Sequence, residues 1–413
     1  MPLWRVFRVG VRYNEGVMQA SSVVSPGPAA AEAIGFAKAT GTTPWSARVM
    51  VLAALFILVG ILWDISWHST IGRDTFWTPA HICIHIGGTL GGLVSGWLIL
   101  RTTFAGSRED REGSVRLWGF YGPLGAWVTV WGALAMLTSA PFDDWWHNAY
   151  GLDVKILSPP HSVLAAGMFF HVVGGLLLVL SVQNRAGESS GQTAGRWLFA
   201  LAAGIKICLA SIMVTEESLP NLQHTGTFYQ ICCGLYPFYL MALARASKLT
   251  WPATIIAAIY MLLIGAAVWI LPLFPAQPML APIFNPLKQM APPAFPLLLI
   301  VPAFGLDLVT RALGRGRGWK RDLLIVLLSG TVFLALILPV QWFFSKHLIS
   351  PEAKNWFFGG CGFFTFADTP GPGWHRFWGE PLTIGSLGAA WILAVASSGI
   401  GLLVGNAMTK VRR

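Results

Sequence analysis

Continuous apolar segments separated by short polar stretches recur along this chain from about residue 47 to residue 406. A transmembrane helix needs about 20 predominantly apolar residues, whereas a transmembrane strand would show alternating polar and apolar positions, which these segments do not. The pattern predicts an all-α integral membrane protein, a polytopic helical bundle of about ten transmembrane helices. The predicted spans are 47–66, 78–100, 118–140, 158–182, 196–214, 224–244, 250–272, 293–311, 322–343 and 384–406.

The composition strengthens this prediction. Of the 413 residues, 54% are hydrophobic and only 11% are charged, a balance typical of membrane proteins and unlike that of soluble domains. Residues 1–46 lack the unbroken apolar core of a signal peptide because Glu32 interrupts them, so we expect an N-terminal arm or surface helix there. The five cysteines show no CxxC spacing and therefore predict no disulfide framework.

The distribution of basic residues predicts the orientation. Most of the 28 lysines and arginines lie in the N-terminal segment, in the loops after the second, fourth, sixth and eighth spans, and in the C-terminal tail. Loops rich in Lys and Arg stay on the cytoplasmic side, so both termini are expected to be cytoplasmic. The net charge of +10 then reflects membrane topology. It gives no case for nucleic-acid binding, and the expected partner of these segments is the lipid bilayer.

Two loops between apolar segments carry the same set of chemistry-bearing residues. In the first, Asp64 and His68 end one predicted span, and His81 follows Thr78-Pro79 at the start of the next. Side chains four residues apart lie on one face of a helix, about 5–6 Å apart at Cβ, and proline suits the first helical turn. Because the loop is short, one carboxylate and two imidazoles are expected to converge.

The second loop repeats this arrangement. Either Asp143 or Asp144 supplies the carboxylate, and His147 and His161 supply the imidazoles, the last after a Ser-Pro-Pro sequence. One extra residue separates the two histidines compared with the first copy. The chain is therefore predicted to hold two carboxylate–imidazole–imidazole groups.

A glycine and a second aspartate also repeat in the two copies, and one further histidine follows the first copy. Gly72 and Gly151 fall at the same offset in the two copies, as do Asp74 and Asp153. The two aspartates are candidate acceptors for the free imidazole N–H groups. His85, one helical turn after the second histidine of the first copy, is a further candidate ligand or a hydrogen-bonded core histidine.

Ligand chemistry alone leaves the metal open. Two histidines and one carboxylate with open positions are typical of non-haem Fe(II), and imidazole-rich sites also suit copper or zinc. The alternative for either copy alone is a solvated polar cluster or a salt-bridge group with Arg73. Ionisable groups at membrane spans are unfavourable and usually functional, and here the whole constellation occurs twice, which favours metal binding.

The first copy resembles a known copper-site segment. Residues Asp64–Ile82 contain Asp-x3-His-x12-His with Arg-Asp-Thr and Thr-Pro-Ala-His inside it. This segment resembles that of the C subunit of particulate methane and ammonia monooxygenases, the copper membrane monooxygenase family. The resemblance implies that Asp64, His68 and His81 are copper ligands and form the catalytic site.

The same family has a second site further along its C subunit, with the pattern Asn-x3-His-x13-His. Asp143, His147 and His161 match that spacing, with Asp in place of Asn. The replacement adds a negative charge, so the metal and the role of the second site stay open.

The second half of the chain has a fainter likeness to the A subunit of these enzymes. It is carried by Leu249–Ile255, by Pro293-Ala294 ahead of Leu306-Asp307, and by Thr369–Arg376. The resemblance implies a C-subunit-like part with the metal-binding helix pairs (47–185) and an A-subunit-like transmembrane bundle (190–413). The N-terminal arm (1–46) precedes them, and the bundle includes a long outer loop at 343–383.

The resemblance also implies a function. It predicts a membrane-embedded copper-dependent monooxygenase subunit that activates O₂ and hydroxylates a small substrate of the methane, short-alkane or ammonia class. Copper is the expected cofactor, with iron as the alternative, and O₂ is the co-substrate. Further expectations are a homo-oligomeric, multi-subunit complex, a separate B-like subunit with soluble domains, quinol as candidate reductant, and a bacterial inner or intracytoplasmic membrane. The alternative is a non-catalytic copper-binding, copper-handling or structural membrane subunit of a larger complex.

Overall fold

The computed structural model describes residues 44–72, 77–151, 158–185, 192–277, 279, 287–314, 318–353 and 375–412. Within these ranges nine helices are long and apolar enough to cross a membrane, and the one sheet has two strands. The protein is therefore a helical, multi-pass membrane protein. The nine helices are α1 (Trp45–Thr70), α2 (Pro79–Ala105), α4 (Leu124–Tyr150), α5 (Pro159–Arg185), α6 (Gln192–Ile212), α7 (Gly226–Ala246), α8 (Pro252–Ile270), α10 (Trp319–Leu348) and α12 (Ile384–Met408).

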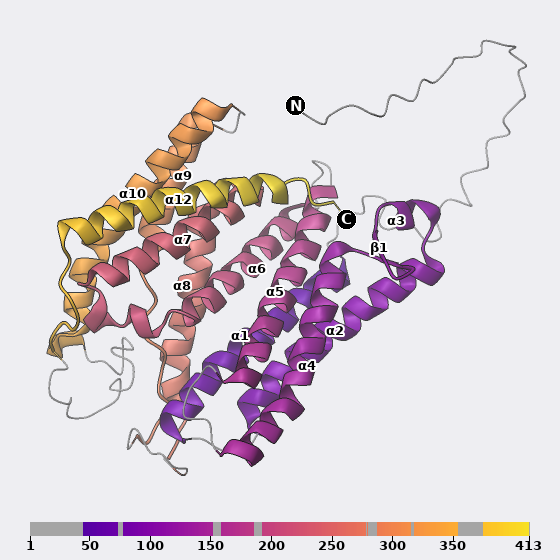
Figure 1. Ribbon diagram of the computed structural model, residues 1–413, viewed down its shortest axis with the longest axis horizontal. Coiled ribbons are helices and arrows are strands. Elements are labelled where there is room, and N and C mark those ends of the chain that lie inside the picture. Colours follow the sequence, from indigo (N-terminus) through magenta and orange to yellow (C-terminus); the bar gives the residue numbers. More distant parts are fainter. Residues whose placement is uncertain are drawn as a thin grey trace, which may run out of the picture. The chain divides into compact units, whose positions relative to one another are not determined.

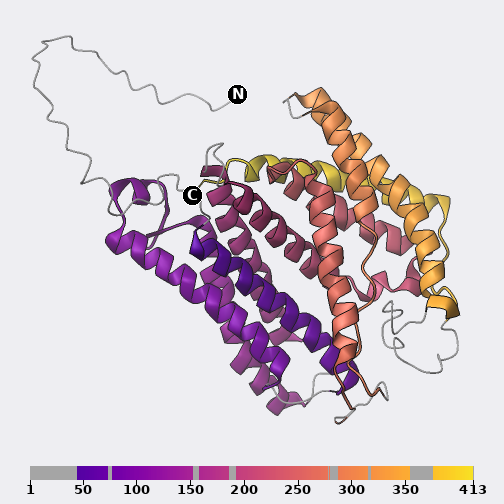
Figure 2. The ribbon, with the colours of Figure 1, turned by 180° about the vertical axis from the view of Figure 1, so that it is seen from behind.

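Shorter elements connect these helices. A five-residue helix and a small hairpin, α3 (Arg108–Glu112), β1 (Val115–Leu117) and β2 (Phe120–Gly122), join α2 to α4, and α9 (Ile300–Leu313) precedes α10. Figure 1 shows α1, α2, α4 and α5 side by side, with α6 between them and the α7–α12 group; Figure 2 shows the same arrangement from behind.

The first and second halves of the chain share one hydrophobic core. From Ala39 onward the chain forms one compact unit, and a continuous cluster of buried apolar side chains extends from α1 to α12. The predicted parts 47–185 and 190–413 thus correspond to the α1–α5 and α6–α12 helices of a single packed bundle. The predicted N-terminal arm lies outside the described residues except at its end, where α1 begins.

Glycines allow α4 and α5 to pack backbone against backbone. A Cβ at Gly125 would lie 2.4 Å from the carbonyl oxygen of Gly174, and one at Gly132 would lie 2.7 Å from that of Gly167. Gly87 of α2 approaches α1 in the same way. Small residues at such spacings let membrane helices approach closely where apolar burial gives no net drive for association. This contact sets the relative position of the α4 end and the α5 start, where the second set of predicted ligands lies.

The structure differs from the prediction over residues 293–311. The first part of this range is not helical, and α9 begins only at Ile300 and has 14 residues. Pro292, Pro293 and Pro296 explain the difference, because each lacks the backbone N–H that a helix would use. The segment nevertheless runs across the bundle: Ala291 contacts the end of α1, and Arg311 contacts Thr250 just before α8.

Side chains satisfy the backbone of this non-helical segment. The N–H of Leu297 donates to the hydroxyl of Tyr260 (3.1 Å), and the N–H of Leu298 donates to Oε1 of Gln341 (3.1 Å). Irregular backbone at membrane depth is tolerated only where protein groups or water satisfy it. Buried Tyr and Gln side chains on α8 and α10 therefore satisfy backbone N–H groups that a helix would otherwise pair.

The predicted outer loop 343–383 starts later than expected, because α10 continues to Leu348. Residues 354–374 lie outside the described part of the chain. The returning stretch is held against the start of α7, where the His224 ring stacks between Trp342 and Phe377 with centroids 3.5 Å away on each side. The N–H of Leu382 also donates to the carbonyl of His224 (3.1 Å).

Candidate metal centre

Two helix starts place the second histidine of each copy. Thr78 is the N-cap of α2, and its hydroxyl accepts a hydrogen bond from the N–H of His81 (3.1 Å). The hydroxyl of Ser158 accepts in the same way from the N–H of His161 (3.3 Å). Such capping satisfies an N–H of the first turn that has no partner within the helix, and the intervening proline suits that turn. The repeated Ser/Thr-Pro-x-His sequence is thus a helix start that carries a histidine at a set position.

Two helix ends place the other ligands. Gly72 and Gly151 have φ of 109° and 85°, a positive-φ backbone that residues with a side chain rarely adopt. The N–H of Gly151 donates to the carbonyl of His147 (2.9 Å), and that of Gly72 donates to Trp67 (3.3 Å). The glycine repeated in the two motifs is therefore a helix C-terminal residue, one turn beyond the aspartate–histidine pair.

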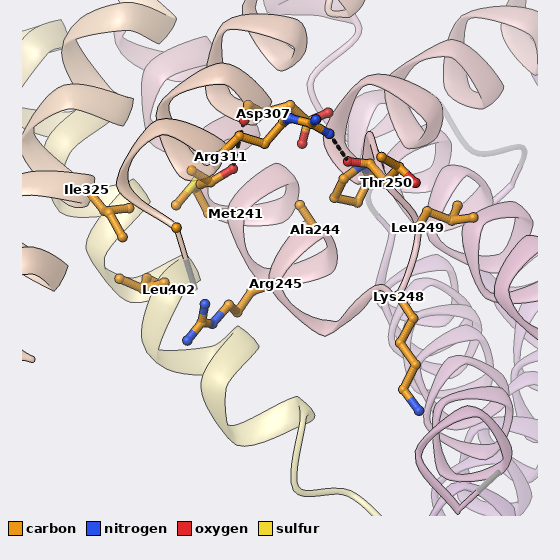
Figure 3. A pocket seen from close by; sticks show the side chains of 13 residues that line it. Met241, Ala244, Arg245, Lys248, Leu249, Thr250, Asp307, Arg311, Ile325 and Leu402 are labelled. Carbon is orange, nitrogen blue, oxygen red and sulfur yellow. Dashed lines mark hydrogen bonds between the residues drawn. The ribbon is translucent and has the colours of Figure 1, made fainter. Parts of the chain in front are cut away.

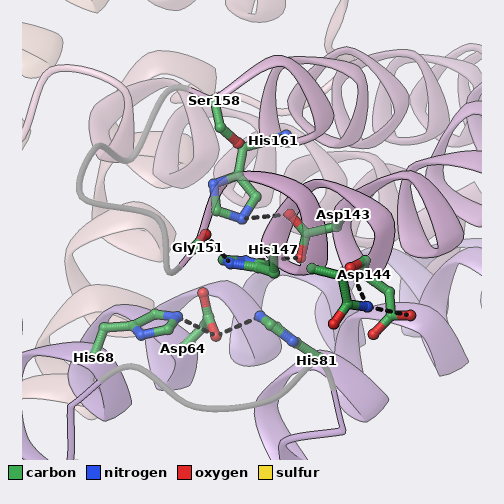
Figure 4. A network of polar contacts seen from close by, with 10 residues as sticks. Asp64, His68, His81, Asp143, Asp144, His147, Gly151, Ser158 and His161 are labelled. Carbon is green, nitrogen blue, oxygen red and sulfur yellow. Dashed lines mark hydrogen bonds and ion pairs between the residues drawn. The ribbon is translucent and has the colours of Figure 1, made fainter. Parts of the chain in front are cut away.

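In the first triad, Asp64, His68 and His81, both imidazoles approach one carboxylate oxygen. Oδ1 of Asp64 lies 3.0 Å from Nε2 of His81 and 3.5 Å from Nε2 of His68. Figure 4 shows both rings directed at this carboxylate. One ligand atom from each residue lies within 4.8 Å of the other two. The structure thus brings together the three residues that the sequence predicts as catalytic ligands.

In the second triad, Asp143, His147 and His161, each imidazole approaches a different oxygen. Nε2 of His147 lies 3.6 Å from Oδ2 of Asp143, and Nε2 of His161 lies 3.5 Å from Oδ1. The predicted span ended at 140, but α4 continues through Pro141 to Tyr150. Asp143 and His147 consequently occupy one helical face, near the start of α5.

The structure distinguishes Asp143 from its neighbour. Asp143 is buried between the two histidines, whereas Asp144 is exposed and its Oδ2 accepts from the side-chain amide of Asn148 (3.5 Å). Nδ1 of His147 lies 3.3 Å from the carbonyl oxygen of Gly151. A hydrogen bond donated from Nδ1 leaves the Nε2 lone pair facing Asp143, as metal-binding histidines require.

A small cavity lies between the two triads. His81 from the first triad and Asp143 and His161 from the second line it, together with His85 and apolar side chains such as Leu164. Its volume is about 10 Å³, close to the space that one water molecule needs. His85 therefore faces the space between the triads and is not part of the group that Asp64 forms with its two histidines.

The first triad fits a single metal ion. Metal–nitrogen and metal–oxygen bonds of about 2.0–2.1 Å in a tetrahedral site hold ligand atoms about 3.3 Å apart. The separations of Asp64 Oδ1 from the two Nε2 atoms, 3.0 and 3.5 Å, lie on either side of this value. The second triad has similar separations but uses both oxygens of Asp143. The donor set suits copper, iron or zinc.

Sequence reasoning missed the residues that support the first triad from the second half of the chain. The hydroxyl of Ser66 donates to the carbonyl of Ala291, and the hydroxyl of Thr70 accepts from the N–H of Ala291 (2.8 Å). The N–H of Met279 donates to the carbonyl of Ile71 (3.1 Å). The available signal was the Ser-x3-Thr pair at the end of α1, beside the predicted ligands. The predicted acceptors Asp74 and Asp153, and also Arg73, lie outside the described residues.

No family model, curated protein or solved structure matched this chain. The class of the protein is therefore defined by its fold and its site. It is a multi-pass helical membrane protein with two Asp-His-His triads beside one small cavity.

Proposed function

We propose that this chain is a copper-dependent membrane monooxygenase subunit, with copper held by Asp64, His68 and His81. The observation that carries the proposal is the approach of both imidazoles to a single oxygen of Asp64, at 3.0 and 3.5 Å, at adjoining ends of two membrane helices. The donor set admits iron or zinc as well. The choice of copper rests on the resemblance of Asp64–Ile82 to the C subunit of particulate methane and ammonia monooxygenases.

Bound copper would supply the reduction of O₂ and the transfer of one oxygen atom to a small substrate. The residues of the chain hold and shield it. The Asp64 carboxylate balances part of the positive charge, and the Thr78 cap holds the backbone of His81 in position. Apolar side chains such as Ile84 and Leu164 border the adjoining cavity and exclude bulk water, which protects a reactive centre from side reactions. The substrate class, methane, short alkanes or ammonia, rests on the same resemblance as the choice of copper.

We further propose ten membrane crossings with both termini cytoplasmic. Nine continuous helices alone would leave the termini on opposite sides. The segment from Ala291 to Arg311 contacts the end of α1 at one end and the residue before α8 at the other. We take it as the tenth crossing. The triads would then lie on the outer side of a bacterial inner or intracytoplasmic membrane, away from the basic loops.

The proposed partners follow from the same resemblance. A separate B-like chain with soluble domains would complete a homo-oligomeric complex, and a quinol from the bilayer would supply electrons. The function must be tested on the assembled complex, because activity is expected only when these partners are present.

A second candidate function is copper handling without catalysis. The observation that favours it is the cavity shared by the two triads, which both contribute ligand residues to its wall. Neighbouring sites of similar chemistry would let an ion pass from one to the other. Such a protein would release its copper to an acceptor and would not consume O₂.

The deciding experiment measures metal and turnover on the same samples. The complex is purified in native lipid from wild type, His68→Ala and the control Asp144→Ala, which removes an exposed carboxylate outside both triads. Metal content is determined by mass spectrometry and copper by electron paramagnetic resonance. O₂-dependent oxidation of methane, short alkanes and ammonia is followed in parallel. We expect copper and turnover to fall together in His68→Ala only.

Other outcomes of this experiment have distinct meanings. Copper without O₂ consumption, and with release to a chelating acceptor, would favour copper handling. Iron at the first triad would contradict the copper assignment. Wild-type turnover in a well-folded His68→Ala complex would disprove the proposed catalytic site.

A further inference from the structure

The connection between α2 and α4 lies at the ends of these helices that are remote from the triads (Figure 1). His81 stands at the start of α2 and His147 near the end of α4, whereas the connection joins the end of α2 to the start of α4. Within it, α3 consists only of charged residues, and Arg108 pairs with Glu112 on its exposed surface. The β1–β2 hairpin instead carries aromatic side chains at and beside its turn. One part of the connection therefore suits water, and the other suits a less polar surface.

The turn of the hairpin places a bulky residue where a small one is usual. Leu117 pairs with Phe120, so Trp118 and Gly119 form a two-residue turn, and both have positive φ, 51° and 89°. Such turns favour Asn, Asp or Gly, and a bulky side chain rarely adopts this backbone. Strained backbone of this kind persists where the surrounding structure holds it, often at functional positions. The indole of Trp118 is nevertheless 73% exposed, so burial in the core does not explain its place.

Contacts to both membrane helices hold the hairpin. The N–H of Tyr121 donates to the hydroxyl of Thr103 near the end of α2 (2.8 Å), and that hydroxyl lies 3.2 Å from the carbonyl oxygen of Tyr121. Nε1 of Trp127, near the start of α4, donates to the carbonyl of Val115 (3.2 Å). The position of the turn relative to the bundle is thus set from both sides.

The aromatic rings of the hairpin continue an exposed surface of α2 and α4. The ring of Trp118 packs edge-on against Trp131 of α4, with centroids 5.7 Å apart, and Phe120 packs against Phe104 of α2 at 6.2 Å. Trp131 and Phe104 are 48% and 73% exposed, and both stand on helices long and apolar enough to cross a membrane. The hairpin therefore lies along the flank of the membrane bundle.

The depth of Trp131 places this surface at the edge of the bilayer. With 27 residues, α4 is about 40 Å long, whereas the hydrocarbon core is about 30 Å thick. A helix centred in the bilayer therefore extends about 5 Å beyond the core at each end. Trp131 lies about 10 Å from the start of α4, inside the core and close to its edge. Trp118 contacts this ring from outside the helix, at the boundary where Trp and Tyr are enriched.

We propose that the β1–β2 hairpin is an interfacial anchor that binds the head-group boundary of the bilayer through Trp118. The turn displays the indole at this boundary, the contacts to Thr103 and Val115 hold it at a fixed depth, and α3 stays in water. The anchor fixes one end of the two helices whose other ends carry triad ligands. The inference goes beyond the proposed function and depends neither on a metal at the triads nor on the orientation of the chain.

The test uses the full-length protein in phosphatidylcholine nanodiscs that contain one of two photoreactive phosphatidylcholines. One probe carries its diazirine beside the glycerol backbone, and the other carries it at the end of an acyl chain. Cross-linked residues are located by tandem mass spectrometry. We expect the glycerol-level probe to label residues 117–120 and neither probe to label 108–112. Leu93, exposed near the middle of α2, is the internal control for the acyl-end probe.

Trp118→Asn separates an anchor from a purely structural tryptophan. Asn suits the positive φ of this turn, so Tm in detergent should stay the same or rise. Labelling of 117–120 by the glycerol-level probe should fall about twofold to tenfold, the factor that corresponds to the loss of one aromatic pair. Trp118→Tyr keeps an amphipathic ring and should keep the labelling. Trp319→Asn is the matched control, because Trp319 is 72% exposed at the start of α10 and its loss should leave the hairpin labelling unchanged.

Four outcomes would overturn the proposal. The wild-type hairpin would escape lipid labelling if it lay in water, and it would cross-link to protein and not to lipid if a partner chain covered it. Stronger labelling of 117–120 by the acyl-end probe would place the hairpin too deep for an interfacial anchor. A lowered Tm in Trp118→Asn with unchanged labelling would make the tryptophan structural only.

Discussion

The two triads are built on the same frame but use their carboxylates differently. Each has a glycine that ends the first helix and a Ser or Thr that caps the second. In the first triad one oxygen of Asp64 faces both imidazoles. In the second, Asp143 presents a separate oxygen to each. A repeated motif therefore reproduces the ligand types and their helix positions, while the surrounding packing decides how the ligand atoms converge.

The support of the two triads differs as well. The helix end that carries Asp64 is held by Ser66 and Thr70 to Ala291 in the second half of the chain. The second triad depends on the glycine contact between α4 and α5 and on the carbonyl of Gly151. The two sites can consequently be weakened one at a time, which makes their roles separable by experiment.

The largest effect is expected from Asp64→Ala. Because Oδ1 of Asp64 faces both imidazoles, the loss of this carboxylate should remove the metal from the first triad. Substrate oxidation should then fall by at least about 100-fold, more than the 10–100-fold usual for groups that only support a ligand. Asp143→Ala is expected to remove metal from the second triad only. Metal content per chain and turnover measure both, with Asp144→Ala as control. Equal losses of turnover in the Asp64 and Asp143 variants would contradict the distinction between the triads.

Gly174→Leu should act next most strongly, through packing. A Cβ at Gly174 would lie 2.6 Å from the carbonyl of Gly125, so a larger side chain must separate α4 from α5, at a cost of about 1–3 kcal/mol or more. Thermal unfolding and metal content of the second triad measure the effect. Gly96→Leu is the matched control, because a Cβ there meets nothing within 4 Å. If both variants unfold alike, the glycine contact does not hold the second triad.

Gly151→Ala tests the helix end itself. A Cβ at Gly151 meets nothing within 4 Å, so the effect comes only from the backbone, whose φ of 85° and ψ of −175° lie in a region nearly confined to glycine; about 1–3 kcal/mol is expected. The displaced carbonyl would no longer orient His147, and metal affinity at the second triad should fall while the first keeps its metal. The reciprocal variant, Gly72→Ala, should affect the first triad instead. Any cross-effect of similar size would show that the two sites are coupled through their shared cavity.

The smallest effect is expected from Ser66→Ala. It removes one hydrogen bond to Ala291, worth about 0.5–1.5 kcal/mol, and should slightly weaken metal binding at the first triad only. Equilibrium metal competition against a chelator measures the change, and Ser69→Ala, which loses a bond to Ile65 in its own helix, is the control. An equal change in the two variants would remove the proposed role of the second half in supporting the site.

Local chemistry made much of this molecule predictable. Nine of the predicted spans correspond to helices because apolar length alone identifies them. The i, i+4 spacing of Asp64 and His68, and the proline before His81, predicted their convergence correctly. The prediction failed where local signals competed: three prolines broke the expected span at 293–311, and α4 continued through Pro141 to carry Asp143 and His147 on one helix.

The sequence by itself determined the membrane class, the ligand types and the helix ends that carry them, because these depend on hydropathy, spacing and capping between near neighbours. Only the tertiary structure decided that both triads share one cavity, that Asp143 and not Asp144 faces it, and that Ala291 holds the end of α1. It also brought Arg245, Lys248 and Arg311 to one pocket (Figure 3). Those relationships join residues far apart in the chain, and they arise from how the helices pack, which no local pattern encodes.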